Sequence, residues 1–125
     1  MDIIQTVIVK QILTDKSKQQ LLDFFTDEIL QLQKECEQLQ FEQKKVQYKN
    51  KGSQGNHDFF KKELDIRNEK IKMLEFRIEQ LHILPLGSEI KQKEMQAITR
   101  VEVGDQWDSL QRTIIIKDAR VIEIR

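Results

Sequence analysis

The sequence predicts an α+β protein: a small antiparallel β-sheet or barrel, with a long antiparallel coiled-coil helical hairpin inserted after its first strand. Three observations support this fold class. β-Branched residues crowd into residues 2–12, two heptad series follow, and apolar and polar residues alternate near the end of the chain. At 125 residues the chain fits a single domain, 1–125.

Residues 2–12 form the predicted first strand. The segment contains Ile3, Ile4, Val7, Ile8 and Val9, and β-branched side chains of this kind favour strands over helices. The helical region begins directly afterwards, because Thr14 is suited to cap a helix N-terminus.

Residues 14–83 form the predicted hairpin, since apolar residues recur there at alternating steps of three and four. Gln43 interrupts the first series and Arg67 the second. Gly52 is expected to cap the outgoing helix and Asn56 to begin the return helix. The first series is Leu22, Phe25, Ile29, Leu32, Cys36, Leu39, Gln43 and Val46, and the second is Phe60, Leu64, Arg67, Ile71, Leu74, Ile78 and Leu81.

Two registers satisfy the heptads of an antiparallel pair. One sets Gln43 against Phe60 and Cys36 against Arg67. The other sets Gln43 against Arg67 and Cys36 against Leu74. We prefer the second, because an unpartnered polar group in a seam costs about 1–3 kcal/mol.

Residues 88–125 form a predicted β-region that pairs with the first strand. Pro85 and Gly87 end the second helix. Residues 95–103 then alternate in polarity, and two short strands meet at Asp118-Ala119.

Composition limits the classes of function. Lys plus Arg and Asp plus Glu each number 21, so the chain as a whole has no basic excess that would coat a nucleic acid. Cys36 is the single cysteine, which favours a reducing, cytoplasmic setting. No apolar run reaches the roughly 20 residues of a membrane helix, so we expect no membrane partner.

No motif indicates an enzyme, a cofactor, a metal or a small-molecule substrate. Cys36 falls in a predicted seam, where a small buried side chain is the simplest interpretation. His57 and His82 lie at opposite ends of the second helix and cannot share a metal. The glycines near residue 52 follow no strand, unlike those of phosphate-binding loops.

The hairpin tip is the strongest candidate site. Residues 44–62 contain six lysines and a single acidic residue, Asp58, with aromatic residues among them. Lysines suit phosphates and aromatic rings suit bases, which indicates contact with RNA or the ribosome. The alternative is a solvated bend. The candidate contacts are Lys44, Lys45, Tyr48, Lys49, Lys51, Lys61 and Lys62.

Aromatic residues at the outermost heptad position form a second candidate site. Phe41, Tyr48 and Phe76 all occupy this position, pointing away from the partner helix. Large apolar groups there indicate docking against another protein or a second copy of the chain. Trp107, in "VEVGDQWDSL", is either the core anchor of a small barrel or an exposed stacking residue.

Several segments resemble a known family over essentially the whole chain. "IIQTVIVKQILTDKSKQQLLDFF", "KECEQLQFE", "LPLGSEI" and "VEVGDQWDSL", with "IIIKDARVIEIR", are similar to the YlqD family of small, mainly Firmicute proteins. The resemblance implies no activity, ligand or catalytic residue. The genes of that family tend to lie beside genes for ribosomal proteins and RNA-maturation factors, which favours an RNA-linked role. Family members often have Asp-Gly at Asp118-Ala119, and alanine tolerates positive φ less well, so the turn type stays open.

Overall fold

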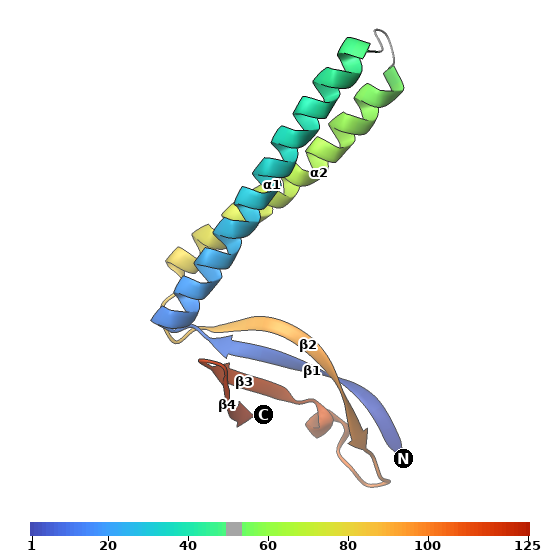
Figure 1. Cartoon of the computed structure of the whole chain (residues 1–125). Coiled ribbons are helices and arrows are strands. Elements are labelled where there is room, and N and C mark those ends of the chain that lie inside the picture. Colours follow the sequence, from blue (N-terminus) through green and yellow to red (C-terminus); the bar gives the residue numbers. More distant parts are fainter. Residues whose placement is uncertain (50–53) are drawn as a thin grey trace. The chain divides into compact units, whose positions relative to one another are not determined.

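The protein is α+β, with two helices and one open four-stranded mixed sheet among the residues that the structure describes (Figure 1). The computed structural model describes residues 1–49 and 54–125, including all of their side chains except those of residues 54–56 and 109. The chain divides into two compact units. We call Met1–Gln19 with Leu84–Arg125 the β-unit and Gln20–Ile83 the helical unit.

The sheet is built around the first strand. β1 (Asp2–Ile12) pairs with β2 (Glu89–Arg100) in the antiparallel direction over its whole length. On its other side, Ile8–Gln11 of β1 pair with β3 (Thr113–Lys117) in the parallel direction. β4 (Arg120–Ile124) is antiparallel to β3, which gives the strand order β2-β1-β3-β4 (Figure 1).

Of the two predicted alternatives, sheet or barrel, the described residues form an open sheet; the prediction that it is purely antiparallel is wrong. After β2, the chain returns through residues 101–112 to the other side of β1, so β3 enters parallel to β1. β2 and β4 therefore lie at opposite edges of the sheet and do not pair. The expected strand at 95–103 also begins earlier and ends at Arg100, so Val101 and Val103 lie outside it.

The core of the β-unit is small. Val7, Val9 and Leu13 are buried, and Ile115 in the middle of β3 has no exposed surface. The alternation of burial along β1 follows from the strand period of two, which turns successive side chains to opposite faces. Many other apolar side chains of this sheet stay exposed, so the β-unit leaves apolar surface available for contacts.

The cap predicted at Thr14 is confirmed. The Ser17 backbone N–H donates to Thr14 Oγ1 at 3.1 Å, and the Thr14 backbone N–H donates to Ser17 Oγ at 2.8 Å. Each side chain thus satisfies a backbone donor of the other, as in a capping box. Thr14 Oγ1 also donates to Asp118 Oδ1 at 2.7 Å, which ties the start of the helix to the β3–β4 turn.

That turn joins β3 and β4 with two residues of positive φ, 46° at Asp118 and 65° at Ala119. Positive φ at both central positions defines a type I′ turn, whose twist matches that of the flanking strands. The hairpin predicted at Asp118-Ala119 is confirmed, and the structure resolves the turn type that the alanine left open.

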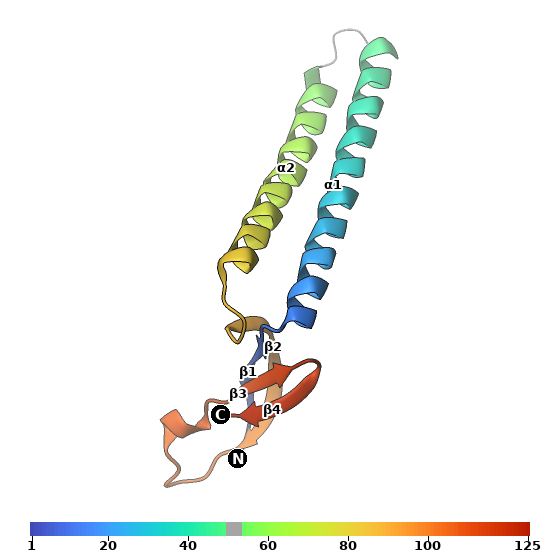
Figure 2. The same cartoon turned by 90° about the vertical axis from the view of Figure 1, so that its left-hand side faces the viewer.

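The helical unit contains most of α1 (Asp15–Lys49) and all of α2 (Gln54–Ile83), which run alongside each other (Figure 2). Every residue of the two predicted seams is buried or partly buried, whereas Phe41 and Phe76 on the outer positions are exposed. Leu32, Phe60 and Leu81 are the most buried seam residues. Asn56 lies inside α2 instead of beginning it, and Gly52 lies outside the described residues.

The preferred helix register is wrong. Arg67 Nε lies 3.7 Å from Glu35 Oε2, and Cys36 Sγ lies 3.9 Å from Asn68 Oδ1, as the other register requires. Arg67 does not face Gln43; its guanidinium instead forms ion pairs with Glu35 on α1 and Glu63 on α2. Arg67 Nη1 donates to Glu63 Oε2 at 2.7 Å.

Candidate nucleic-acid interface

The basic tip gathers lysines from both helices. Lys44, Lys45 and Lys49 lie near the end of α1, and Lys61 and Lys62 near the start of α2; all five are exposed. Gln43 Nε2 and His57 Nδ1 lie 3.2 Å apart, which holds these two stretches at the same end of the helical unit. Lys51 lies outside the described residues.

The described tip lysines are not neutralised by carboxylates. The ion pairs formed within residues 1–49 and 54–125 involve Arg67, Lys91, Arg100 and Arg125, and none of the tip lysines. The Lys45 ammonium lies 4.7 Å from the centre of the Phe41 ring, a cation–π contact that leaves its charge in place. The tip therefore presents positive charge that an anionic partner can neutralise.

Two exposed rings accompany these lysines. Tyr48 is 85% exposed and Phe59 is 57% exposed, so both offer faces on which a base can stack. Phe60 is buried and makes an edge contact with Phe59, with 5.5 Å between ring centres. Phe59 is not among the contact residues expected from the sequence, although the heptad series already assigned its neighbour Phe60 to the seam; the exposure of Phe59 makes it a further candidate.

The outer aromatic residues do not form one stripe. Phe41, Tyr48 and Phe76 are all more than half exposed. With the observed register, however, Phe76 is level with residues near Asp27 of α1, about 20 Å along the axis from Phe41 at 1.5 Å per residue. Phe41 and Tyr48 remain together on α1, and Phe76 belongs to a separate patch.

In the part of the chain that the structure describes, Cys36 and the histidines do not belong to a cluster of potential metal ligands. Cys36 is partly exposed, and its thiol lies 3.9 Å from an amide oxygen of Asn68. Among the described residues, no group of three or more His, Cys, Asp and Glu side chains is placed to hold a metal ion. Neither helix, over the residues described, is long and apolar enough to cross a membrane.

Charge-assisted hydrogen bonds shift the pKa values of Arg67 and Glu89. Hydrogen bonding to Glu63 raises the pKa of Arg67 above its ordinary value, so this guanidinium stays charged. In the β-unit, Arg125 Nη1 donates to Glu89 Oε2 at 3.0 Å and Nη2 donates to Oε1. These bonds lower the pKa of the Glu89 carboxyl below its ordinary value of 4.5.

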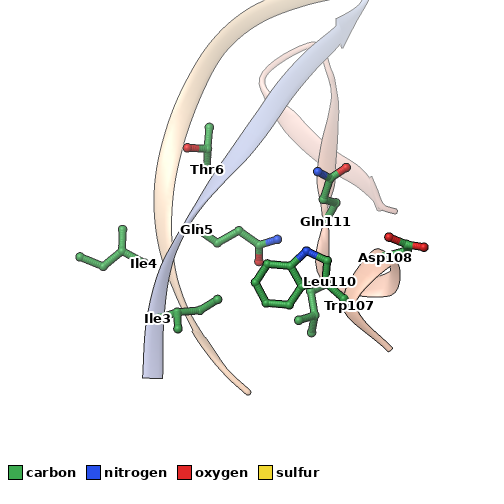
Figure 3. Close-up of a pocket in the computed structure, with 8 residues that line it drawn as sticks. All are labelled: Ile3, Ile4, Gln5, Thr6, Trp107, Asp108, Leu110 and Gln111. Atoms are coloured by element: carbon green, nitrogen blue, oxygen red, sulfur yellow. The ribbon is translucent and has the colours of Figure 1, made fainter. Parts of the chain in front are cut away.

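Trp107 is not a core anchor. It begins the short helix η1 (Trp107–Leu110) and is 70% exposed. Its indole lines a pocket between η1 and the first half of β1 (Figure 3). No pattern in the sequence indicated this pocket, because it depends on where residues 101–112 return beside β1.

The fold and these surfaces define a class of protein: an α+β chain whose two long helices lie, in sequence, between the first and second strands of an open mixed sheet. The chain belongs to the YlqD family, whose model, described as YlqD protein, matches residues 1–125. This confirms the resemblance drawn from the sequence.

A sequence comparison supports the family, and a structural comparison bears on the fold. The chain is 43% identical over 127 residues to the protein named "Uncharacterized protein YlqD" of Bacillus subtilis (strain 168), covering 100% of this chain and 98% of that one. A crystal structure of a protein of unknown function from Synechococcus sp. WH 8102 has a TM-score of 0.86 at 15% identity, covering 100% of this chain and 94% of that one. At this identity the structural likeness shows a shared fold.

Proposed function

We propose that this protein is a non-enzymatic, cytoplasmic binding protein that contacts RNA, free or in the ribosome, through its basic tip. In this proposal α1 and α2 form an antiparallel coiled-coil hairpin, which the burial of both heptad series supports. The observation that carries the proposal is the set of five exposed tip lysines, none paired with a carboxylate in the described part of the chain. Tyr48 and Phe59 add stacking surface beside them.

The salt dependence of binding tests this proposal. The probe is a fluorescein-labelled single-stranded RNA of mixed sequence, titrated with the intact protein at several salt concentrations. Each phosphate contact adds about 0.7 to the slope of log affinity against log salt, so five lysines predict a slope of about −3.5. Affinity is then expected to fall on the order of 100-fold between 50 and 200 mM salt.

A charge-matched pair of variants makes the test specific. The tip variant, Lys44→Gln with Lys49→Gln, Lys61→Gln and Lys62→Gln, should lose most of this slope. The control changes four exposed lysines away from the tip, Lys16, Lys34, Lys70 and Lys72, to glutamine and should keep it. Equal slopes for both variants would refute contact through the tip.

Gradient sedimentation of cell lysate tests the link to the ribosome. We expect the wild type to sediment with ribosomal particles and the tip variant to be lost from those fractions.

A second candidate function, docking to another protein or a second copy, is favoured by the exposed apolar surface of the sheet. Ile4 on β1 and Ile98 on β2 are directly opposite each other, so they share one face, and they are 72% and 77% exposed. Two exposed isoleucines at adjacent positions offer apolar surface on which another chain could dock. Sedimentation equilibrium of the wild type and of Ile4→Thr/Ile98→Thr tests self-association through this face. Loss of a partner with Phe41→Ser/Tyr48→Ser would instead assign docking to α1.

A further inference from the structure

The pocket beside Trp107 runs along the edge of a strand. It has a volume of about 560 Å³ and lies wholly within the β-unit (Figure 3). Four of its lining residues, Ile3 to Thr6, are consecutive in β1. Successive strand residues point to opposite faces, so a pocket lined by four in a row follows the edge of the strand instead of covering one face. The opposite wall comes from η1 and the residue after it: Trp107, Asp108, Leu110 and Gln111.

The backbone at this edge faces the pocket side. Met1 and Val101 exchange two hydrogen bonds, of 3.0 and 2.8 Å, and so form a hydrogen-bonded antiparallel pair. Such pairs alternate along a ladder, so the N–H and C=O groups of Asp2, Ile4 and Thr6 point away from β2. In the described part of the chain, β3 pairs only with Ile8–Gln11 and leaves this earlier stretch of the edge without a neighbouring strand.

We propose that this edge of β1 binds an extended peptide segment of a partner protein, which adds to the sheet as a fifth strand between β1 and η1. The site is independent of the basic tip and of any contact the tip makes with RNA. Asp2 to Val7 span roughly 20 Å at about 3.3 Å per residue, enough to pair with about six residues of the incoming strand. Main-chain hydrogen bonds would provide the affinity, and alternate side chains of the peptide would provide the specificity.

The chemistry of the pocket identifies its occupant. A row of N–H and C=O groups that recurs at every second residue matches the repeat of another peptide backbone. Ile3, Trp107 and Leu110 line the pocket with apolar surface, and Asp108 is its single charged lining residue. An apolar segment that carries a lysine or arginine complements this wall. The Asp108 carboxylate, with no cation among the lining residues, repels phosphate, so nucleic acid is a poor occupant.

Selection from a phage-displayed library of random nine-residue peptides, carried out on the intact protein, provides the probe. We expect the selected peptides to alternate apolar and polar residues and to include a basic residue. Trp107 is the single tryptophan of the chain and is 70% exposed, so its emission should shift to the blue as a synthetic copy of the peptide covers it. A copy with alternate backbone amides N-methylated keeps the side chains but loses the donors, and should bind at least tenfold more weakly.

Thr6→Pro tests the protein side of the same hydrogen bonds. Thr6 directs its N–H away from β2, so proline removes a donor from the open edge without removing one from the β1–β2 ladder. We expect Thr6→Pro to weaken peptide binding about tenfold and the control Thr6→Val, which keeps the N–H, to bind as the wild type does. If Thr6→Pro fails to fold, the N-methylated peptide alone decides the outcome.

Three results would overturn the proposal. The first is that the library enriches no peptide. The second is that the N-methylated copy binds as tightly as its parent, and the third is that the selected peptides leave Trp107 emission unchanged. Self-association of the wild type that Thr6→Pro abolishes and Thr6→Val retains would also overturn it, since the occupant of the edge would then be a second copy of the chain.

Discussion

Replacing Ala119 with glycine should stabilise the protein, because Ala119 holds a left-handed backbone conformation that glycine adopts without a side-chain penalty. Its φ is 65°, in the second central position of the β3–β4 turn. The neighbouring Asp118 stays unchanged, since its carboxylate accepts a hydrogen bond of 2.7 Å from Thr14 Oγ1. Ala119→Gly therefore lowers the conformational free energy of the turn without removing the hydrogen bond between Thr14 and Asp118.

The expected change in the free energy of unfolding is the difference between two opposing effects of Ala119→Gly. A left-handed conformation costs an L-residue roughly 1–2 kcal/mol, which glycine avoids. Glycine also widens the conformational freedom of the unfolded chain, which costs about 0.4–1 kcal/mol. The first effect is the larger, so the net stabilisation should be about 0.8 kcal/mol. For a chain or unit of this size, that corresponds to a rise in Tm of roughly 3–6 °C.

Urea unfolding followed by Trp107 emission measures this change, because Trp107 and the turn belong to the same compact unit. We expect Ala119→Gly to raise the midpoint at an unchanged m-value. Ala119→Val provides the control in the opposite direction, since a β-branched residue suits positive φ still less and should lower the midpoint. The reasoning is refuted if Ala119→Gly is less stable than the wild type, or if valine is tolerated as well as glycine.

Two further predictions concern an ion pair and a seam residue. The pKa of Glu89 is lower in the folded chain than its ordinary 4.5, so the stabilisation by Arg125 is present above about pH 4.5 and is lost as the pH falls through the folded value. Thermal melts at pH 7 and pH 3.5 should therefore show a smaller acid-induced loss of Tm for Arg125→Gln than for the wild type; equal losses would count against this linkage. Phe60→Ala should lower the free energy of unfolding by about 3–5 kcal/mol, measured by helical circular dichroism, because Phe60 is buried in the seam. Tyr48→Ala, at an 85% exposed position, should change it by less than about 0.5 kcal/mol, and similar losses for both would contradict the seam.

Local sequence signals predicted the elements well. Residues 2–12 form β1 as expected, because β-branched residues favour strands whatever their partner. The cap at Thr14 and the hairpin turn at Asp118-Ala119 were also correct, since each depends on a few adjacent residues. The heptad spacing identified which residues of both helices turn inward, since helical period fixes the face of every side chain.

Pairing between distant segments was harder to predict. The predicted register of the helices was wrong at Arg67, because heptad spacing alone did not show that its guanidinium pairs with Glu35 and Glu63. The choice between sheet and barrel stayed open, because alternating polarity identifies a strand without indicating which strand lies beside it. Among the candidate sites, the tip lysines were identifiable from local composition, whereas the separation of Phe76 from Phe41 depended on the helix register.

By itself, then, the sequence determined the type and order of the main elements and the inward face of each helix, because these depend on neighbours within a few residues. It also determined the charge of the tip, where the two helices bring together lysines that composition had already placed near the bend. Only the tertiary structure decided that β3 runs parallel to β1, that β2 and β4 stay apart, and that Trp107 lines a pocket with residues 3–6 of β1. Those outcomes depend on the path of residues 101–112 past β1, and the return of a chain past a distant strand leaves no local period in the sequence.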